Sequence, residues 1–142
     1  MSLPAKSVVT VPPPKLTYDE FMCALCAWRE ARGESDEAIR GVLWVIRNRV
    51  ADKRWPSTAA GVILQPYQFS SFLAGDPNVV RFPQPKNRAE WAAWERCVAL
   101  TLAPGDDPTH GAVGYESCPD DAEPRWANTP VARIGAFEFY VL

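Results

Sequence analysis

The chain has 142 residues, which suits one domain with a hydrophobic core of its own. Hydrophobic residues make up 47% of the chain, which is typical of a globular protein. The formal net charge is −2 and the sequence has no basic stripe, so we do not expect it to bind nucleic acid. No apolar run approaches the roughly 20 residues of a membrane-spanning helix, so we expect no membrane span.

The N-terminal segment is rich in proline and lacks the apolar centre of a secretory signal. We therefore expect residues 1–16 to be a flexible leader and residues 17–142 to form a single domain. If the protein acts outside the cytoplasm, it then needs another route of export.

The first helix is expected to begin at Thr17 and Glu20, which have the spacing of a capping box. Gly33 is suited to ending this helix, and Ser35 to capping the next one. Glu30 then falls in the last turn of an apolar helix. The negative end of the helix dipole favours the protonated form of a carboxyl there, as a general acid requires.

The same stretch also has an ordinary structural interpretation. Glu30 and Glu34 are four residues apart, and Arg29 and Arg32 could pair with them on a solvated helix face. Exposed pairs of this kind are common and contribute only about 0–1 kcal/mol. Spacing alone therefore leaves both a catalytic and a structural role open for Glu30.

The second helix is the clearest element, over residues 36–51. Its apolar stripe consists of Ile39, Val42, Leu43, Ile46 and Val50. Pro56 separates it from a short helix that we expect Ser57 to cap and that extends to about residue 64. Residues 67–72 could be a short strand or a cleft-lining loop, and residues 74–86 are predicted to be loop.

Residues 87–102 are predicted to form a third long helix, with Asn87 as its cap. Residues 111–115 could be a short strand, and residues 131–134 and 137–140 have the pattern of a β-hairpin. The predicted fold class is α+β, mainly helical with a small β-hairpin portion.

The four cysteines are Cys23, Cys26, Cys97 and Cys118. Zinc would need a second closely spaced ligand pair, and a redox Cys-x-x-Cys pair opens a helix after a strand, so neither motif fits well. We interpret the cysteines mainly as small buried hydrophobes; a disulfide stays open as an alternative. We expect no metal and no cofactor.

Five motifs occur in a fixed order between about residues 18 and 140. They are Glu30-Ala31-Arg32-Gly33-Glu34, Asn48-Arg49-Val50, Gln68-Phe69-Ser70, Asp107-Pro108-Thr109-x-Gly111-Ala112-x-x-Tyr115 and Arg133-Ile134-Gly135-x-x-x-Phe139-Tyr140. Together they resemble the catalytic domain of the SleB/CwlJ-type cell wall hydrolases, known from spore cortex-lytic enzymes and also found in bacteriophages. Each motif alone is weak, but five in register make the resemblance strong.

The resemblance implies a lysozyme-like catalytic domain over residues 17–142. Such a domain cleaves peptidoglycan glycan strands between N-acetylmuramic acid and N-acetylglucosamine, as a lytic transglycosylase. The family's single essential glutamate falls on Glu30. The chain departs from the family at Trp28-Arg29 and at residues 113–116, which bears on substrate contacts rather than on the chemistry.

A lytic transglycosylase needs only one acid/base, because the C6 hydroxyl of the muramic acid replaces water as nucleophile. We expect Glu30 to take this role, kept protonated by partial burial against aromatic and apolar side chains. Arg29 and Arg32 would oppose that if they faced Glu30. We therefore predict that both point away and that Arg32 pairs with Glu34.

Further candidate substrate contacts are Glu34, Gln68, Ser70, Thr109, Tyr115 and Trp126. Glu34 could instead serve as the second carboxylate of a hydrolytic muramidase, or only as part of an ion pair at the helix junction. The polar side chains among the others could satisfy backbone groups, and Trp126 could stack on a sugar or close the core.

The expected partner is the peptidoglycan glycan strand, bound by a monomer that acts at the bacterial cell wall. The lack of a signal favours a bacteriophage enzyme released through a holin or carried in a virion. A non-catalytic peptidoglycan-binding or virion structural module is an alternative. A metal-dependent amidase or peptidase is disfavoured, because His110 is the only histidine.

Overall fold

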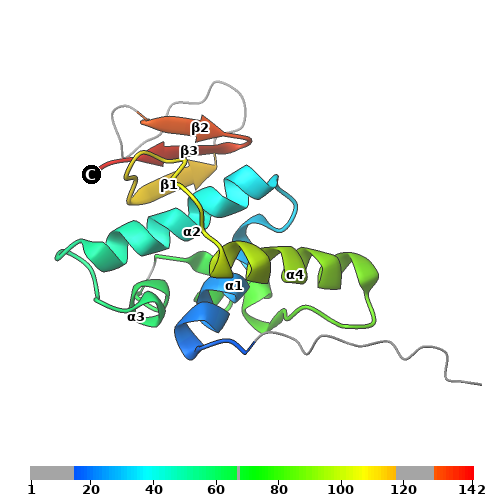
Figure 1. Cartoon of the computed structure of the whole chain (residues 1–142). Helices are drawn as coiled ribbons and strands as arrows, with labels where there is room; N and C mark the ends of the chain where they lie inside the picture. The colour runs from blue at the N-terminus through cyan, green and yellow to red at the C-terminus, as the bar shows by residue number, and fades with distance from the viewer. Residues whose placement is uncertain (1–14, 67, 118–129) are drawn as a thin grey trace, which may run out of the picture.

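The computed structural model describes residues 15–66, 68–117 and 130–142. Most of the predicted leader, Cys118 and Trp126 therefore lie outside the described residues. The described chain is mainly helical and carries one small antiparallel sheet, which confirms the predicted α+β class (Figure 1).

The first two helices begin where their capping residues predict. Helix α1 spans Tyr18–Ala31, and its capping box is complete: Thr17 N donates to Glu20 Oε1 at 2.9 Å, and Glu20 N donates to Thr17 Oγ1 at 3.1 Å. Helix α2 spans Asp36–Ala51, and the Ser35 hydroxyl accepts its cap bond. Two helix ends are thus determined by local side-chain chemistry.

The short helix α3 begins one residue later than predicted. Helix α3 spans Ala59–Ile63, and its cap is Thr58 rather than Ser57. Thr58 Oγ1 accepts a bond from Gly61 N at 3.1 Å. The helix begins one residue later than expected because Asp19 of α1 accepts a bond from Ala60 N and so satisfies an early amide.

The last long helix is the predicted one, and the segment before it contains short 3₁₀ turns. Helix α4 spans Arg88–Leu102, and the Asn87 side chain caps it as predicted. The segment before it contains two 3₁₀ turns, η1 (Ser70–Phe72) and η2 (Pro77–Val80). A strand was one of the two expectations for residues 67–72, and the described part of this range, residues 68–72, does not form one.

The sheet has the strand order β1-β3-β2, with β1 spanning Gly114–Ser117, β2 spanning Ala132–Ile134 and β3 spanning Phe137–Tyr140. The predicted hairpin is β2 and β3. Strand β1 begins at Gly114 rather than Gly111, because the preceding residues form a turn in which His110 and Gly111 have φ values of 56° and 87°. Such positive values do not belong to a strand.

Helix α2 separates the sheet from the other helices (Figure 1). The sheet packs closely on α2 at Gly41, where an added Cβ atom would lie 2.6 Å from Phe139 Cζ. Glycine is therefore required at this position by the distance between helix and sheet rather than by a backbone conformation.

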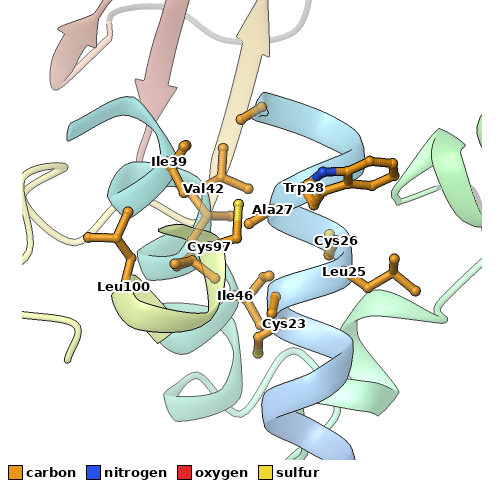
Figure 2. Packing of buried hydrophobic residues seen from close by; sticks show 14 of the residues in the cluster. Cys23, Leu25, Cys26, Ala27, Trp28, Ile39, Val42, Ile46, Cys97 and Leu100 are labelled. Atoms are coloured by element: carbon orange, nitrogen blue, oxygen red, sulfur yellow. The ribbon is translucent and has the colours of Figure 1, made fainter. Parts of the chain in front are cut away.

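Helix α1 is the centre of the core, since nine of its 14 residues are buried. Figure 2 shows Cys26, Ala27 and Trp28 on α1, with Ile39 of α2 and Cys97 of α4 packed around them. Because α1 is surrounded in this way, the side chains of its last turn have a fixed position.

The described cysteines are Cys23, Cys26 and Cys97; all are free and buried, which confirms their interpretation as small core residues. Burial raises the pKa of the Cys23 and Cys97 thiols to about 12, so both stay protonated. Within the described ranges, no group of three or more His, Cys, Asp or Glu side chains is arranged to hold a metal ion. None of the described helices is both long and apolar enough to cross a membrane.

Candidate active site

Glu30 lies in the last turn of α1 and is half-buried. The hydroxyl of Tyr115, on β1, donates a hydrogen bond of 2.7 Å to Glu30 Oε1. No other hydrogen bond joins the Glu30 carboxyl to a described side chain, so its second oxygen remains available to a ligand. The contact connects the end of the central helix to the edge strand of the sheet.

Tyr115 is held in an aromatic cluster. Its ring centroid lies 6.4 Å from that of Phe69, 5.2 Å from that of Phe137 and 5.8 Å from that of Phe139. Burial raises the pKa of Tyr115 well above its ordinary value, and the charge of Glu30 raises it further. Tyr115 is therefore a neutral hydrogen-bond donor over the whole pH range in which an enzyme of this kind would work.

The end of α1 opens onto a pocket of about 440 Å³, lined by residues 29–34, Asn78, Ser117, Ala136 and Phe137. Both candidate carboxylates, Glu30 and Glu34, lie in its wall. The other lining residues come from η2, from the end of β1 and from the turn between β2 and β3 with the start of β3. The pocket is open to solvent.

The Arg29 side chain points away from Glu30, as predicted. Its guanidinium donates to the backbone oxygens of Ser71, Val79 and Arg81 at 3.0–3.2 Å. The group also lies between two rings, 4.7 Å from the Phe72 centroid and 4.9 Å from the Phe82 centroid. Arg29 thus fixes the loop that supplies Asn78 to the pocket.

Arg32 also points away from Glu30, but the predicted pair with Glu34 is wrong. Arg32 Nη1 donates to the oxygens of Trp28 and Arg29 at 3.2 and 3.3 Å, at the C-terminal end of α1. Glu34 instead turns toward the β2–β3 hairpin, where its Oε1 accepts a long bond of 3.4 Å from Ala136 N. The free carbonyls at the helix end provide Arg32 with closer partners than the carboxylate does.

The motif at the end of α2 holds the segment that leads into β1, a role that the sequence analysis did not assign. Arg49 Nε donates to Val113 O at 2.6 Å, and Arg49 Nη1 donates to Gln68 Oε1 at 3.0 Å. Asn48 Nδ2 donates to Asp107 Oδ2 and to Ala112 O, each at 2.9 Å. Tyr115 therefore reaches Glu30 from a segment that is anchored twice to α2.

Three of the remaining candidates lie outside the pocket wall. Thr109 is fully buried, and its hydroxyl donates to Asp107 Oδ1 at 2.7 Å and accepts from Ala112 N. Gln68 is exposed, and its side-chain oxygen accepts a hydrogen bond from Arg49. Ser70 is exposed at the start of η1. Trp126 lies outside the described residues.

Comparison with known proteins places the chain in a family. Residues 33–140 match the cell wall hydrolase family, a range that includes Glu34 and Tyr115 and begins just after Glu30. The spore cortex-lytic enzymes of Bacillus subtilis (strain 168) and Oceanobacillus iheyensis are each 31% identical to it, over 85% and 92% of this chain. The chain spans 37% and 44% of the length of these two relatives.

Two solved structures share its fold. The catalytic domain of the germination-specific lytic transglycosylase SleB from Bacillus anthracis has a TM-score of 0.66 and 29% identity, covering 91% of this chain and 98% of that one. The catalytic domain of the Bacillus cereus SleB protein has a TM-score of 0.61 and 28% identity, covering 89% and 93%. The chain belongs to the cell wall hydrolase family.

Proposed function

We propose that this chain is a lytic transglycosylase that cleaves peptidoglycan strands between N-acetylmuramic acid and N-acetylglucosamine, with Glu30 as the only acid/base. The observation that carries the proposal is the hydrogen bond from Tyr115 to Oε1 of Glu30, a residue that lies in the wall of an open pocket. The similarity to a lytic transglycosylase from Bacillus anthracis supports the type of reaction.

The first step is proton transfer from the Glu30 carboxyl to the glycosidic oxygen, while the bond from that oxygen to C1 of the muramic acid breaks. The carboxylate that remains accepts the hydrogen bond from Tyr115. A neutral phenol stabilises a carboxylate more than a carboxylic acid, so this bond strengthens as charge develops.

The second step protonates Glu30 again. Its carboxylate accepts the proton of the C6 hydroxyl of the same muramic acid, and the C6 oxygen forms a bond to C1. The products are a 1,6-anhydromuramic acid end and a strand with a free C4 hydroxyl, and no water is consumed. Because the nucleophile belongs to the sugar already bound, its effective concentration is high.

A hydrolytic muramidase is the second candidate, because Glu34 lies in the same pocket wall as Glu30. In that mechanism Glu34 would activate a water molecule or act as nucleophile, and the products would carry reducing ends. The contact of Glu34 with Ala136 N is long at 3.4 Å, which is consistent with a weak structural role and leaves the side chain able to turn.

The variant Glu34→Gln distinguishes the two mechanisms. We expect it to retain most of the wild-type rate and to release the same anhydro products, since the proposed reaction does not use Glu34 as acid, base or nucleophile. Mass spectrometry of purified peptidoglycan after digestion measures both. A loss of turnover as deep as that of Glu30→Gln would favour the two-carboxylate mechanism instead.

The setting of the activity follows from the substrate. We propose that the protein acts at the bacterial cell wall as a monomer; elution of the purified chain in size-exclusion chromatography tests the monomer. Release through a bacteriophage holin, or transport in a virion, stays a prediction from the sequence. A non-catalytic module would release no fragments from peptidoglycan in the same digestion.

A further inference from the structure

Arg32 occupies a fixed position in the wall of the Glu30 pocket. Its guanidinium lies over the indole of Trp28, 4.5 Å from the ring centroid, and its Nη1 donates to two backbone oxygens at the end of α1. Its Nε and Nη2 atoms make no hydrogen bond to any residue that the structure describes. These two atoms share one edge of the guanidinium, the edge that binds a carboxylate side-on.

A second guanidinium group, that of Arg81, lies near the Arg32 side chain. The guanidinium of Arg81 lies over the same indole, 6.0 Å from its centroid, and pairs with Glu90 at 2.8 Å. The guanidinium groups of Arg32 and Arg81 therefore both lie near the Trp28 ring, and the carboxylate of Glu90 pairs with Arg81. Burial lowers the pKa of Arg32 and the charge of Arg81 lowers it further, while Glu90 acts in the opposite direction. An anion at Arg32 would compensate this excess charge.

The pocket's own carboxylates do not provide that anion. Glu30 accepts its hydrogen bond from Tyr115, and Glu34 is turned toward Ala136. Among the described residues, neither forms an ion pair with Arg32. The pocket thus presents a preorganised cation in the same wall as the proposed acid, on a side chain that stacking and two hydrogen bonds hold in place.

We propose that Arg32 forms a subsite for a carboxylate carried by the muramic acid residue of the substrate; this rests on the proposed function. N-acetylmuramic acid differs from N-acetylglucosamine by a lactyl ether that ends in a carboxyl group. That group is free in a bare glycan strand and continues into a stem peptide, with a carboxylate of its own, in a substituted strand. Arg32 distinguishes the two alternating sugars and so determines which glycosidic bond faces Glu30.

Arg32 also covers the Trp28 ring, and a test must separate this packing role from charge recognition. Arg32→Met keeps an apolar side chain over the indole and removes the cation. The matched control is Arg47→Met, because Arg47 stacks on Trp44 in the same way, 4.7 Å from its centroid, and does not line the Glu30 pocket. Arg32→Lys keeps the charge but not the bidentate edge.

Binding is measured in the Glu30→Gln protein, which should not cleave the strands. Two kinds of glycan strand serve as probes: peptide-free strands, which carry lactyl carboxylates, and peptide-bearing strands, which carry the carboxylates of the stem peptide. Each kind is used in two forms, with its carboxylates free and with them converted to N-methylamides. We expect the Glu30→Gln protein to bind at least one carboxylate-bearing form about tenfold more tightly than its blocked form. A preference on peptide-free strands identifies the lactyl carboxylate, and a preference only on peptide-bearing strands identifies the stem.

The subsite predicts that Arg32→Met abolishes this preference, that Arg32→Lys keeps part of it and that Arg47→Met keeps all of it. Equal weakening for free and blocked strands would show a packing role only and overturn the proposal, as would the absence of any carboxylate preference. These binding ratios do not depend on turnover. If the active protein released no anhydro products while the ratios held, the reaction would be wrong and the subsite right.

Discussion

The bond from Tyr115 to Glu30 Oε1 joins two residues that are 85 positions apart in the chain. The sequence indicated that both belong to the site, but it placed the Tyr115 hydroxyl on a sugar. Local spacing contains no information on a partner so distant, so the contact itself could not be predicted. The predicted pair of Arg32 with Glu34 was wrong for a related reason: closeness in sequence does not decide between a carboxylate and free backbone carbonyls.

The variant Tyr115→Phe removes this bond and keeps the ring in its aromatic cluster. We expect kcat to fall by about 10- to 100-fold, as for the loss of a hydrogen bond to a charged group of about 1.5–3 kcal/mol. Initial rates at saturating concentrations of purified peptidoglycan measure kcat for both proteins.

KM and thermal stability must be measured together with kcat, because the Tyr115 ring also packs against Phe69, Phe137 and Phe139. A tenfold rise of KM at unchanged kcat would instead mean that Tyr115 binds the sugar.

Helix boundaries were the most predictable part of the fold. The caps at Thr17, Ser35 and Asn87 act within a few residues, so their local sequence was sufficient to find them. The cap of α3 and the start of β1 were displaced by contacts from elsewhere: Asp19 reaches α3 from α1, and the turn before β1 is held by α2. Such tertiary contacts override local preference.

The turn before β1 is organised by Asp107, which gives a prediction on pH. Its partial burial raises the pKa, but bonds from Thr109, Asn48 and the Gly111 amide lower it more, so the pKa lies below the ordinary 3.8. The ionised form therefore stabilises the fold. This contribution is present above pH 3.8 and is lost as the pH falls through the lowered folded-state pKa.

The variant Asp107→Asn should accordingly be less stable than wild type at about pH 6 and closer to wild type well below the ordinary pKa. Free energies of unfolding in urea test this, measured for both proteins at about pH 6 and at a pH well below 3.8. If the gap between the two proteins were as large in acid as at neutral pH, the charge of Asp107 would not be what stabilises the turn.

The arrangement of the whole molecule brings the site together, because α2 lies between the helical core and the sheet (Figure 1). Tyr115 of β1 can reach Glu30 of α1 only if the neighbouring strand β3 packs closely on α2. Gly41 makes this approach possible, since a Cβ atom there would meet the Phe139 ring at 2.6 Å. The hydrophobic pattern predicted the helices and the hairpin but not the distance between them.

The variant Gly41→Ala tests that distance. Alanine favours a helix by up to about 1 kcal/mol, but overpacking against Phe139 should cost more, for a net loss of about 1–2 kcal/mol in the free energy of unfolding. The control for stability is Gly33→Ala, where an added Cβ atom meets nothing within 4 Å. Equal or higher stability of Gly41→Ala would show that the sheet can move away from α2 without cost.

The proposed chemistry depends on Glu30, which lies just before the range that matches the family. The most direct measurement is mass spectrometry of the muropeptides released from purified peptidoglycan by the wild-type chain and by Glu30→Gln. We predict 1,6-anhydromuramic acid ends from the wild type and no released fragments from the folded variant. Reducing ends in place of anhydro ends, or undiminished release by Glu30→Gln, would contradict a single-glutamate transglycosylase.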